Sequence, residues 1–387
     1  MLLGNYPGKQ GLKLPATKFK KLSPPPRILL GPGPSNVSKA AYDALATPII
    51  GHLDPDFLAM MDEIGEMLRT VFQTRNRLTI PMSGTGSSGM ETAFVNVIDP
   101  GDTVVIGVNG VFGERMCDVA ERCGAKTVRV EAPWGDIIEP DGFISALKKN
   151  PEAKIAAIVH AETSTGARQP LEEIGNHLRD TDTIFLVDAV TSLAGCDLKI
   201  DDWGVDICYS GTQKCLSIPP GISPVTFSEK AENALFSKKN KVQSWYLDLS
   251  MICKYWGSER VYHHTAPVSM LFALREGLRI VLEEGLQNRF ERHEKLGRML
   301  SEKLSALGFE PFAREGFQLP MLASVILPEG LDDAETRRTL LNEYKIEVGP
   351  GLGETKGKIW RIGLMGESCS AENVEALSSA LKSLRGG

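Results

Sequence analysis

The chain has 387 residues, enough for two hydrophobic cores, and 42% hydrophobic and 24% charged residues are ordinary fractions for a globular protein. A formal net charge of −6 gives no reason to expect nucleic acid or an anionic membrane as a partner. No window approaches about 20 uninterrupted apolar residues, so we expect no membrane span. Seven scattered cysteines without a Cys-x-x-Cys pair argue against a disulfide framework or a zinc site. They favour a reducing compartment, the cytoplasm.

Residues 1–27 differ from the rest of the chain. They contain several Lys residues and no acidic one, and three consecutive prolines at 24–26 close the segment with a stiff, extended stretch. We expect an extended N-terminal arm that packs on the body of the protein or on a neighbouring subunit. An organelle transit peptide is the alternative, because such peptides are also basic, but Arg and Ser are scarce here. The final residues 385–387 do not match a peroxisomal signal.

Between residues 78 and 227, short apolar runs alternate with longer amphipathic ones. The seven expected strands are residues 78–82, 103–107, 126–131, 154–160, 183–188, 207–210 and 223–227. The expected helices between them are residues 88–97, 112–122, 140–149 and 171–178. This alternation predicts an α/β layer with a mostly parallel seven-stranded sheet.

The remainder of the chain predicts a second, smaller domain. A helix with apolar residues at helical spacing covers 268–284, and the pattern changes after Gly285. The elements expected after it are a helix at 289–307, a strand at 322–327, a helix at 333–344, a strand at 359–364 and a final helix after the capping pattern at 370–373. We therefore expect a large α/β domain at 28–286 and a smaller C-terminal α+β domain at 287–387.

A glycine-rich loop, SGTGSSG at residues 83–89, separates an expected strand from an expected helix. Glycines let the backbone approach a ligand closely, and free N–H groups at the start of a helix attract an anion. The hydroxyls of Thr85 and Ser87 would add hydrogen bonds. The loop lacks the endings and spacings of nucleoside-triphosphate and dinucleotide sites. A simple strand-to-helix turn is the alternative reading of the loop alone.

Two polar residues follow expected strands. Asp188 ends an apolar strand, where a carboxylate requires a cation or hydrogen bonds, and a protonated pyridine nitrogen is one such cation. Lys214 lies among small residues after the next strand, and burial there would favour the neutral amine, which attacks aldehydes. Taken singly, Asp188 fits a helix cap or a solvated strand end, and Lys214 fits a surface position. The order of phosphate loop, Asp188 and Lys214 is far more specific than any member alone.

With their flanking motifs, these residues resemble the class V aminotransferases of pyridoxal-phosphate (PLP) fold type I. The chain is most similar to the alanine/serine–glyoxylate aminotransferase family. The matching motifs, in family order, are LGPGPSN at 30–36, SGTG at 83–86, HAETSTG at 160–166, VD at 187–188, YSGTQK at 209–214, YHHT at 262–265, GLG at 351–353 and RIG at 361–363.

The resemblance implies a PLP-dependent transfer of an amino group from alanine or serine to glyoxylate or pyruvate. Lys214 would form the Schiff base and carry the proton, Asp188 would pair with the pyridine nitrogen, and Arg361 would bind the substrate carboxylate. The turn containing Gly33 would shape a small substrate pocket. The other implied cofactor contacts are Thr85, Gly86, Ser87 and Gln213 at the phosphate, Thr163 and Gln213 beside the ring oxygen, Phe112 on the ring face, and Tyr262 and Thr265 from the other subunit of a homodimer.

Two departures from the family leave the amino donor open. Well-studied animal members have Trp where this chain has Phe112, and His where it has Ser87. The alternatives are another small-substrate aminotransferase, or a desulfurase or lyase on the same fold. The latter is disfavoured because no cysteine lies on an evident catalytic loop. A non-catalytic binding protein would be expected to lose Lys214 or Asp188. No cluster has metal-ligand spacing, and we find no second motif-placed cation for a dicarboxylic substrate.

Overall fold

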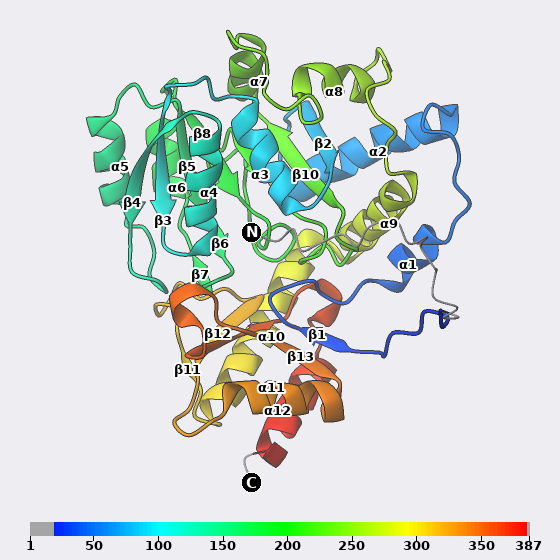
Figure 1. Ribbon diagram of the computed structural model, residues 1–387, viewed down its shortest axis with the longest axis vertical. Helices are drawn as coiled ribbons and strands as arrows, with labels where there is room; N and C mark the ends of the chain where they lie inside the picture. Colours follow the sequence, from blue (N-terminus) through cyan, green and yellow to red (C-terminus); the bar gives the residue numbers. More distant parts are fainter. Residues whose placement is uncertain (1–18, 385–387) are drawn as a thin grey trace, which may run out of the picture.

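The computed structural model describes residues 19–384 and divides them between two sheets (Figure 1). The larger region holds a seven-stranded sheet with helices around it, and the smaller region holds a five-stranded sheet. Helix α9 (Val268–Glu284) lies in the larger region, and α10 (Leu286–Ser305) follows it directly along the smaller one. Within residues 19–384, no helix is long and apolar enough to cross a membrane.

The large sheet confirms the expected mostly parallel, seven-stranded arrangement. Its order is β2-β10-β9-β8-β5-β3-β4, and β10 alone is antiparallel to its neighbours. The bounds are β2 Leu78–Ser83, β3 Thr103–Val108, β4 Lys126–Glu131, β5 Ile155–Val159, β8 Ile184–Asp188, β9 Ile207–Tyr209 and β10 Ile222–Phe227. Each corresponds to one of the seven expected apolar runs.

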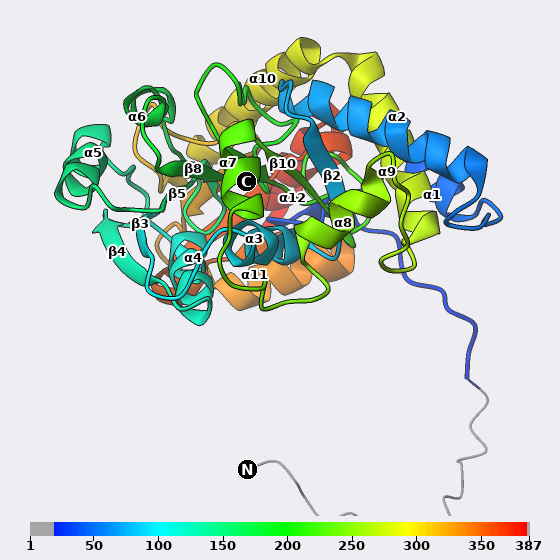
Figure 2. The same ribbon diagram turned by 90° about the horizontal axis from the view of Figure 1, so that it is seen from above.

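Helices cover both faces of this sheet (Figure 2). One face packs on α2 (Pro55–Phe72), α5 (Pro140–Lys149), α6 (Glu172–Leu178) and α9. The other packs on α3 (Gly86–Val95), α4 (Val111–Arg122), α7 (Glu229–Phe236) and α8 (Leu249–Trp256). The sequence of strand β5 is apolar throughout because its side chains enter both cores. Ala156 and Ile158 enter the first core, whereas Ala157 and Val159 enter the second.

The smaller sheet has the order β1-β13-β14-β12-β11. Its strands are β1 Ile28–Leu30, β13 Ile346–Pro350, β14 Ile359–Gly363, β12 Leu322–Ile326 and β11 Glu310–Pro311. Helices α10 and α12 (Ala371–Leu384) supply the apolar side chains that pack against it. The remaining elements are α1 Lys39–Leu45, the β6–β7 pair (Ala161–Glu162 and Ala167–Arg168), α11 Asp333–Thr339 with a π-helical turn at Leu340–Tyr344, and 3-10 turns at Gly353–Thr355 and Gly366–Ser368.

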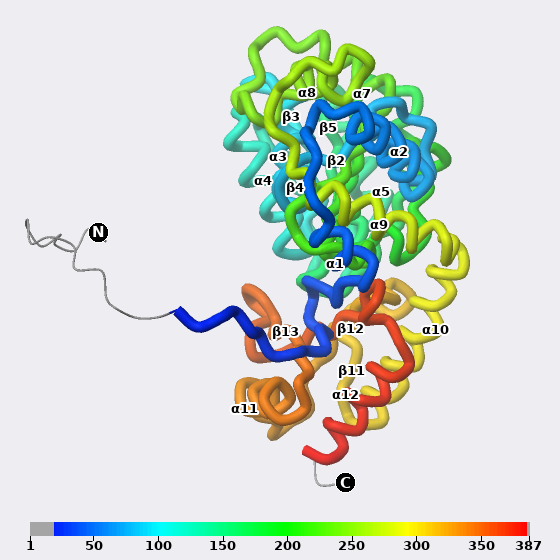
Figure 3. Tube along the Cα trace, turned by 90° about the vertical axis from the view of Figure 1, so that its right-hand side faces the viewer, coloured from blue at the N-terminus to red at the C-terminus, as the bar shows by residue number. Residues whose placement is uncertain are grey.

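The position of β1 differs from the expected start of the large domain at residue 28. Ile28 to Leu30 pair in parallel with Ile346 to Val348 of β13, and Leu30 is buried in the smaller core. The chain therefore begins its regular structure in the smaller region and then rises to α1 and α2 (Figure 3). The apolar run 28–30 is too short to show from sequence alone which sheet it joins.

The expected N-terminal arm lies largely outside the described residues, since nothing is described before residue 19. Residues 19–26 have no regular structure, and their side chains are exposed. Phe19 and Leu22 are among the most exposed apolar side chains, at 95% and 88%. This part of the arm therefore does not pack on the body of its own chain. Packing on a neighbouring subunit stays a prediction.

Candidate active site

The chemistry-bearing residues meet at one edge of the large sheet. Strands β2, β5, β8 and β9 run in the same direction, so their carboxyl ends lie at the same edge, where open α/β sheets bind ligands. A cavity of about 210 Å³ opens there. Its lining contains eight of the expected site residues, namely Thr85, Gly86, Ser87, Phe112, Thr163, Asp188, Gln213 and Lys214.

Lys214 is a buried amine, with 9% of the residue exposed. Burial, and secondarily the charge of Arg361, lowers the pKa of Lys214 to about 8. Its Nζ donates a hydrogen bond to the carbonyl of Pro32. Gly33, with φ +115°, lies against the same amine, and a Cβ at residue 33 would come within 2.5 Å of Nζ. A side chain at residue 33 would therefore displace the amine.

Asp188 is a buried carboxylate that is already oriented. Oδ1 accepts a 2.8 Å hydrogen bond from the backbone N–H of Val190, and Oδ2 accepts one of 2.8 Å from the Tyr209 hydroxyl. Burial raises the pKa of Asp188 to about 6, although both hydrogen bonds oppose the rise. A cationic partner in the cavity would favour the ionised form further.

The start of α3 forms the anion-binding end of the cavity. The helix begins at Gly86, two residues before the expected start, and its N-cap Thr85 makes no side-chain capping bond. The first N–H groups of a helix have no partner within the helix, and the helix dipole places partial positive charge there. Thr85 and Ser87 are exposed at this end. The loop thus presents N–H and hydroxyl donors to the cavity.

One buried carboxylate, that of Glu162, joins Phe112 at the start of α4 to the loop that carries Thr163. Glu162 Oε2 accepts hydrogen bonds from the N–H groups of Phe112 at 3.1 Å and Gly113 at 3.4 Å, in the first turn of α4. Its Oε1 accepts bonds from Ser164 N and Oγ at 3.0 and 2.5 Å. Glu162 is fully buried, and this burial raises its pKa to about 7. The carboxylate therefore caps α4 from the loop that carries Thr163.

Arg361 reaches the site from strand β14 of the smaller sheet. Its Nε donates to the carbonyl of Pro350 at 2.9 Å, and its Nη1 donates to the carbonyl of Thr163 at 3.2 Å. Among residues 19–384, Nη2 has no hydrogen-bond partner. Burial lowers the pKa of Arg361 to about 10, so the group is still a cation at neutral pH. Hydrogen bonds therefore hold the guanidinium at Nε and Nη1 and leave Nη2 free.

Comparison with known proteins identifies the family. The family model described as aminotransferase class-V matches residues 39–376. The chain belongs to the class V aminotransferases. It is 40% identical to the (S)-ureidoglycine–glyoxylate transaminase of Bacillus subtilis strain 168, over 94% of this chain and 92% of that protein. It is 39% identical to the alanine–glyoxylate aminotransferase of Callithrix jacchus, over 95% and 90%. The crystal structure of alanine–glyoxylate aminotransferase from Nostoc sp. superposes with a TM-score of 0.93 at 48% identity, covering 95% of this chain and 98% of that one.

The cofactor of this class V aminotransferase is pyridoxal phosphate, and its fold is PLP fold type I. Polar groups in the cavity fit that cofactor. Gln213 Oε1 and Thr191 Oγ1 are buried without a hydrogen-bond partner among residues 19–384, although buried polar atoms are nearly always paired. Gln213 and Thr191 would bond the polar edges of the cofactor, the start of α3 would hold its phosphate, and Asp188 would hold its ring nitrogen.

The structure does not bring Tyr262 and Thr265 to the cavity of their own chain. Neither residue lines it, both are exposed, and their hydroxyls lie 3.5 Å apart. In this aminotransferase, the two residues are therefore free to reach a second subunit. Their placement in a partner's site stays a prediction.

Four of the site residues described above escaped the sequence reasoning, among them Thr191, for which the sequence offers no signal. Tyr209 and Glu162 lie inside the matched motifs, but nothing in the sequence shows that they orient Asp188 and Phe112. Arg115 also lines the cavity, with its guanidinium carbon 4.8 Å from the centre of the Phe112 ring. Its spacing of three from Phe112 on α4 is a signal that could have identified it, since such residues share a helix face.

Proposed function

We propose that this class V aminotransferase moves the amino group of alanine or serine to glyoxylate, with pyruvate as a second acceptor. The proposal rests on the guanidinium of Arg361 beside Lys214. Its Nε and Nη1 form hydrogen bonds within the protein, and its other side is free to bind a carboxylate. A planar guanidinium matches a carboxylate with two parallel hydrogen bonds. The backbone of Gly33 lies close against the amine of Lys214, which narrows the space for a substrate side chain and so favours small substrates.

A second cation near the cavity does not alter this conclusion. Arg115 was not expected, and it lines the same cavity. Its charge acts on the pKa of Asp188, whereas the charge of Arg361 acts on the pKa of Lys214. Arg115 lies over the Phe112 ring, with its guanidinium carbon 4.8 Å from the ring centre, whereas Arg361 binds the Thr163 carbonyl from the smaller region. A dicarboxylic substrate would need its second cation on the Arg361 side of the cavity.

The chain's own residues account for each remaining part of the reaction. When bound, PLP holds the substrate nitrogen covalently and withdraws electrons from the substrate Cα. Arg361 orients the substrate carboxylate. The amine of Lys214, with its lowered pKa, would accept the proton from the substrate Cα and hold it for transfer. Asp188 keeps the pyridine nitrogen protonated, and Tyr209 holds Asp188 in place.

(S)-Ureidoglycine is the second candidate donor, because the Bacillus subtilis relative acts on it and is 40% identical. The printed names of this relative and of the Nostoc protein share glyoxylate as the other substrate. The likeness therefore supports the acceptor more strongly than the donor. We place alanine and serine first because the Nostoc protein, named for alanine, is 48% identical to this chain.

The test is a matrix of single-turnover and steady-state rates with the purified enzyme. Alanine, serine and (S)-ureidoglycine are the donors, and glyoxylate, pyruvate and 2-oxoglutarate are the acceptors. We expect the highest kcat/KM for alanine or serine with glyoxylate. A preference for ureidoglycine would move the enzyme to the second candidate. Use of 2-oxoglutarate at rates that rival glyoxylate would contradict the small-substrate proposal.

We also propose that the enzyme is a homodimer with shared sites. Tyr262, one of the two expected partner contacts, is 55% exposed. Two further aromatic side chains near it are also exposed, Trp245 at 61% and Tyr246 at 42%. The ring of Tyr262 lies 5.4 Å from that of His52, and the ring of Trp245 stacks at 4.3 Å on His263. Exposed apolar surface of this kind is typical of an interface. A second copy would cover it and receive Tyr262 and Thr265.

A further inference from the structure

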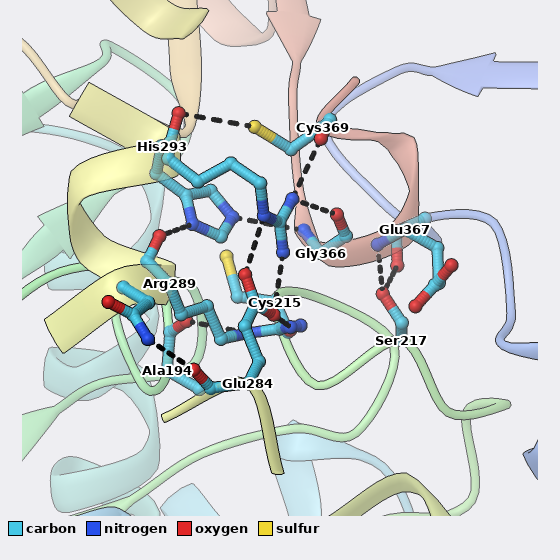
Figure 4. A network of polar contacts seen from close by, with 12 residues as sticks. Ala194, Cys215, Ser217, Glu284, Arg289, His293, Gly366, Glu367 and Cys369 are labelled. Carbon is cyan, nitrogen blue, oxygen red and sulfur yellow. Dashed lines mark hydrogen bonds and ion pairs between the residues drawn. The ribbon is translucent and has the colours of Figure 1, made fainter. Parts of the chain in front are cut away.

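A buried arginine outside the cavity links the two segments that carry the central cofactor residues (Figure 4). Arg289 lies on α10, and only 1% of it is exposed. Its Nε donates to the carbonyl of Ala194 at 3.2 Å, and its Nη2 donates to the carbonyl of Cys215. Ala194 belongs to the segment that follows Asp188, and Cys215 directly follows Lys214. One guanidinium thus joins both segments.

The position of Lys214 depends on few other main-chain contacts. The Lys214 carbonyl accepts hydrogen bonds from Ser35 Oγ at 2.8 Å and from the N–H of Ser217 at 3.0 Å. Ser217, with φ +55°, accepts a 2.7 Å bond at Oγ from the N–H of Glu367. Arg289 holds the Cys215 carbonyl between these contacts, one peptide after the Lys214 carbonyl.

Glu284 forms an ion pair with the buried guanidinium of Arg289 and holds it in place. Its Oε2 accepts from Arg289 Nη1 and, at 2.9 Å, from Arg292 Nη2, and its Oε1 accepts from Arg292 Nε at 2.6 Å. His293 adds no charge, because its Nε2 accepts a 3.1 Å bond from the N–H of Gly366 while burial lowers its pKa to about 3. A buried cation without such a carboxylate would be strongly destabilising.

Arg292 shares the Glu284 carboxylate with Arg289 but binds different main-chain carbonyls. Its Nη1 donates to the carbonyls of Gly366 at 3.0 Å and Cys369 at 2.7 Å, in the turn that precedes α12. Among residues 19–384, Arg292 donates no hydrogen bond to the segment after Asp188 or to the segment after Lys214. The chain therefore offers an internal comparison: two arginines on one helix, with one shared carboxylate and different main-chain partners.

We propose that Arg289 is a positioning residue for Lys214, which sets the placement of the lysine amine relative to Asp188 by bridging the carbonyls of Ala194 and Cys215. The planar guanidinium group can donate hydrogen bonds to both carbonyls and to Glu284 at the same time. A lysine would keep the charge but could not keep this geometry. The proposal rests on the family's cofactor and does not depend on which amino donor the enzyme uses.

The test measures how fast apoenzyme captures the cofactor on Lys214, which needs no amino donor. Apo forms of the wild type, Arg289→Lys and Arg292→Lys are mixed with PLP and cyanoborohydride from pH 6 to 9. The modified Lys214 peptide is quantified by mass spectrometry, and the Tm of each apo form is recorded. Because a displacement of about 1 Å in a reacting group can cost roughly a hundredfold in rate, we expect capture by Arg289→Lys to be about ten- to a hundredfold slower. Capture by Arg292→Lys should stay within about twofold of wild type, even where both variants lose similar Tm.

Equal capture rates for the two variants would overturn the proposal and leave Arg289 as a structural link alone. If Arg289→Lys does not fold, Glu284→Gln takes its place, since it leaves both guanidinium groups and removes their shared charge. Slower capture by Glu284→Gln than by Arg292→Lys would support the proposal. Capture at the wild-type rate would contradict it. A failed donor assignment would leave these rates unchanged, so the two proposals fail separately.

Discussion

Asp188 and Tyr209 are direct neighbours across β8 and β9, and the Tyr209 hydroxyl donates a 2.8 Å hydrogen bond to Oδ2 of Asp188. This bond lowers the pKa of Asp188 against the larger effect of burial, which raises it to about 6. The pairing of β8 with β9 thus places the neutral hydroxyl of Tyr209 beside Asp188, the carboxylate that would hold the protonated ring nitrogen of PLP. Tyr209 is itself completely buried, so the bond is shielded from water.

Tyr209→Phe should weaken cofactor binding by about 1–2 kcal/mol, because a hydrogen bond to a buried charged group is lost. At pH 7, a smaller fraction of Asp188 would be ionised without this donor. The dissociation constant of PLP, from fluorescence titration of the apoenzyme, is the measurement. Tyr344→Phe, in the smaller region, is the matched control. Equal PLP affinity for Tyr209→Phe and wild type would remove Tyr209 from this role.

The covalent capture of PLP by Lys214 should depend on pH with a midpoint near 8. Burial lowers the pKa of the amine from 10.5 to about 8, and the neutral amine is the attacking form. Capture should therefore rise roughly tenfold from pH 6 to 7 and level off above about pH 9.

Because the folded pKa of Lys214 lies below the unfolded one, this group adds stability to the apoenzyme as the pH rises from 8 towards 10.5. Lys214→Ala should fold and show no turnover. A capture rate still rising steeply at pH 10 would contradict the lowered pKa.

Glu162→Gln should destabilise the apoenzyme by about 1–3 kcal/mol and weaken PLP binding as well. The amide offers one acceptor oxygen where the carboxylate receives four hydrogen bonds, and its NH₂ group would face N–H donors. The start of α4 and the Phe112 ring would then shift. Urea unfolding and PLP titration measure the two effects. Glu172→Gln, at the exposed start of α6, is the control and should change neither quantity.

Arg361→Lys should reduce the recognition of every amino and oxo acid by about 1.5–3 kcal/mol while PLP stays bound. Lysine keeps the charge but loses the fork and the two bonds that orient it, to the carbonyls of Pro350 and Thr163. The change should appear as higher KM values for all substrates. If KM rose for one substrate alone, Arg361 would contact a side chain rather than the common carboxylate.

Hybrid dimers test the shared sites directly. Lys214→Ala should be inactive, and a Tyr262→Ala, Thr265→Ala double variant should be strongly impaired. If Tyr262 and Thr265 serve the partner's cavity, each hybrid contains one intact site. An equal mixture that exchanges subunits should then regain about a quarter of wild-type activity. No gain on mixing, with subunit exchange verified by mass spectrometry, would assign these residues to their own chain's site or to none.

Most of the large sheet could be predicted from the sequence because its strands are buried on both faces. Such strands are continuous apolar runs, as in β5, and all seven are present. Strand β1 was wrongly assigned to the large domain, because three apolar residues do not reveal a partner that is distant in the chain. The N-terminal end of α3 was expected two residues late, because glycine and serine at positions 86 and 87 are weak helix formers.

The candidate site was predictable where chemistry requires a residue type, and not where geometry alone matters. Lys214 and Asp188 could be singled out because an amine and a carboxylate are rare at buried strand ends. Glu162 and Arg289 gave no such signal. Their importance follows from which backbone groups they meet, and those contacts come from segments far apart in the sequence. Tertiary contacts of this kind are invisible to local patterns.

The pairing of β1 with β13 has a consequence for how the protein is made. Ile28 leaves the ribosome long before its partner Ile346. The large sheet has all its strands by Phe227 and can form while translation continues. The smaller sheet cannot, so the segment that carries Gly33, directly after β1, cannot be placed until β13 has been synthesised. The end of the site that holds Gly33 and Arg361 is therefore completed after the large sheet, once β13 and β14 have been synthesised.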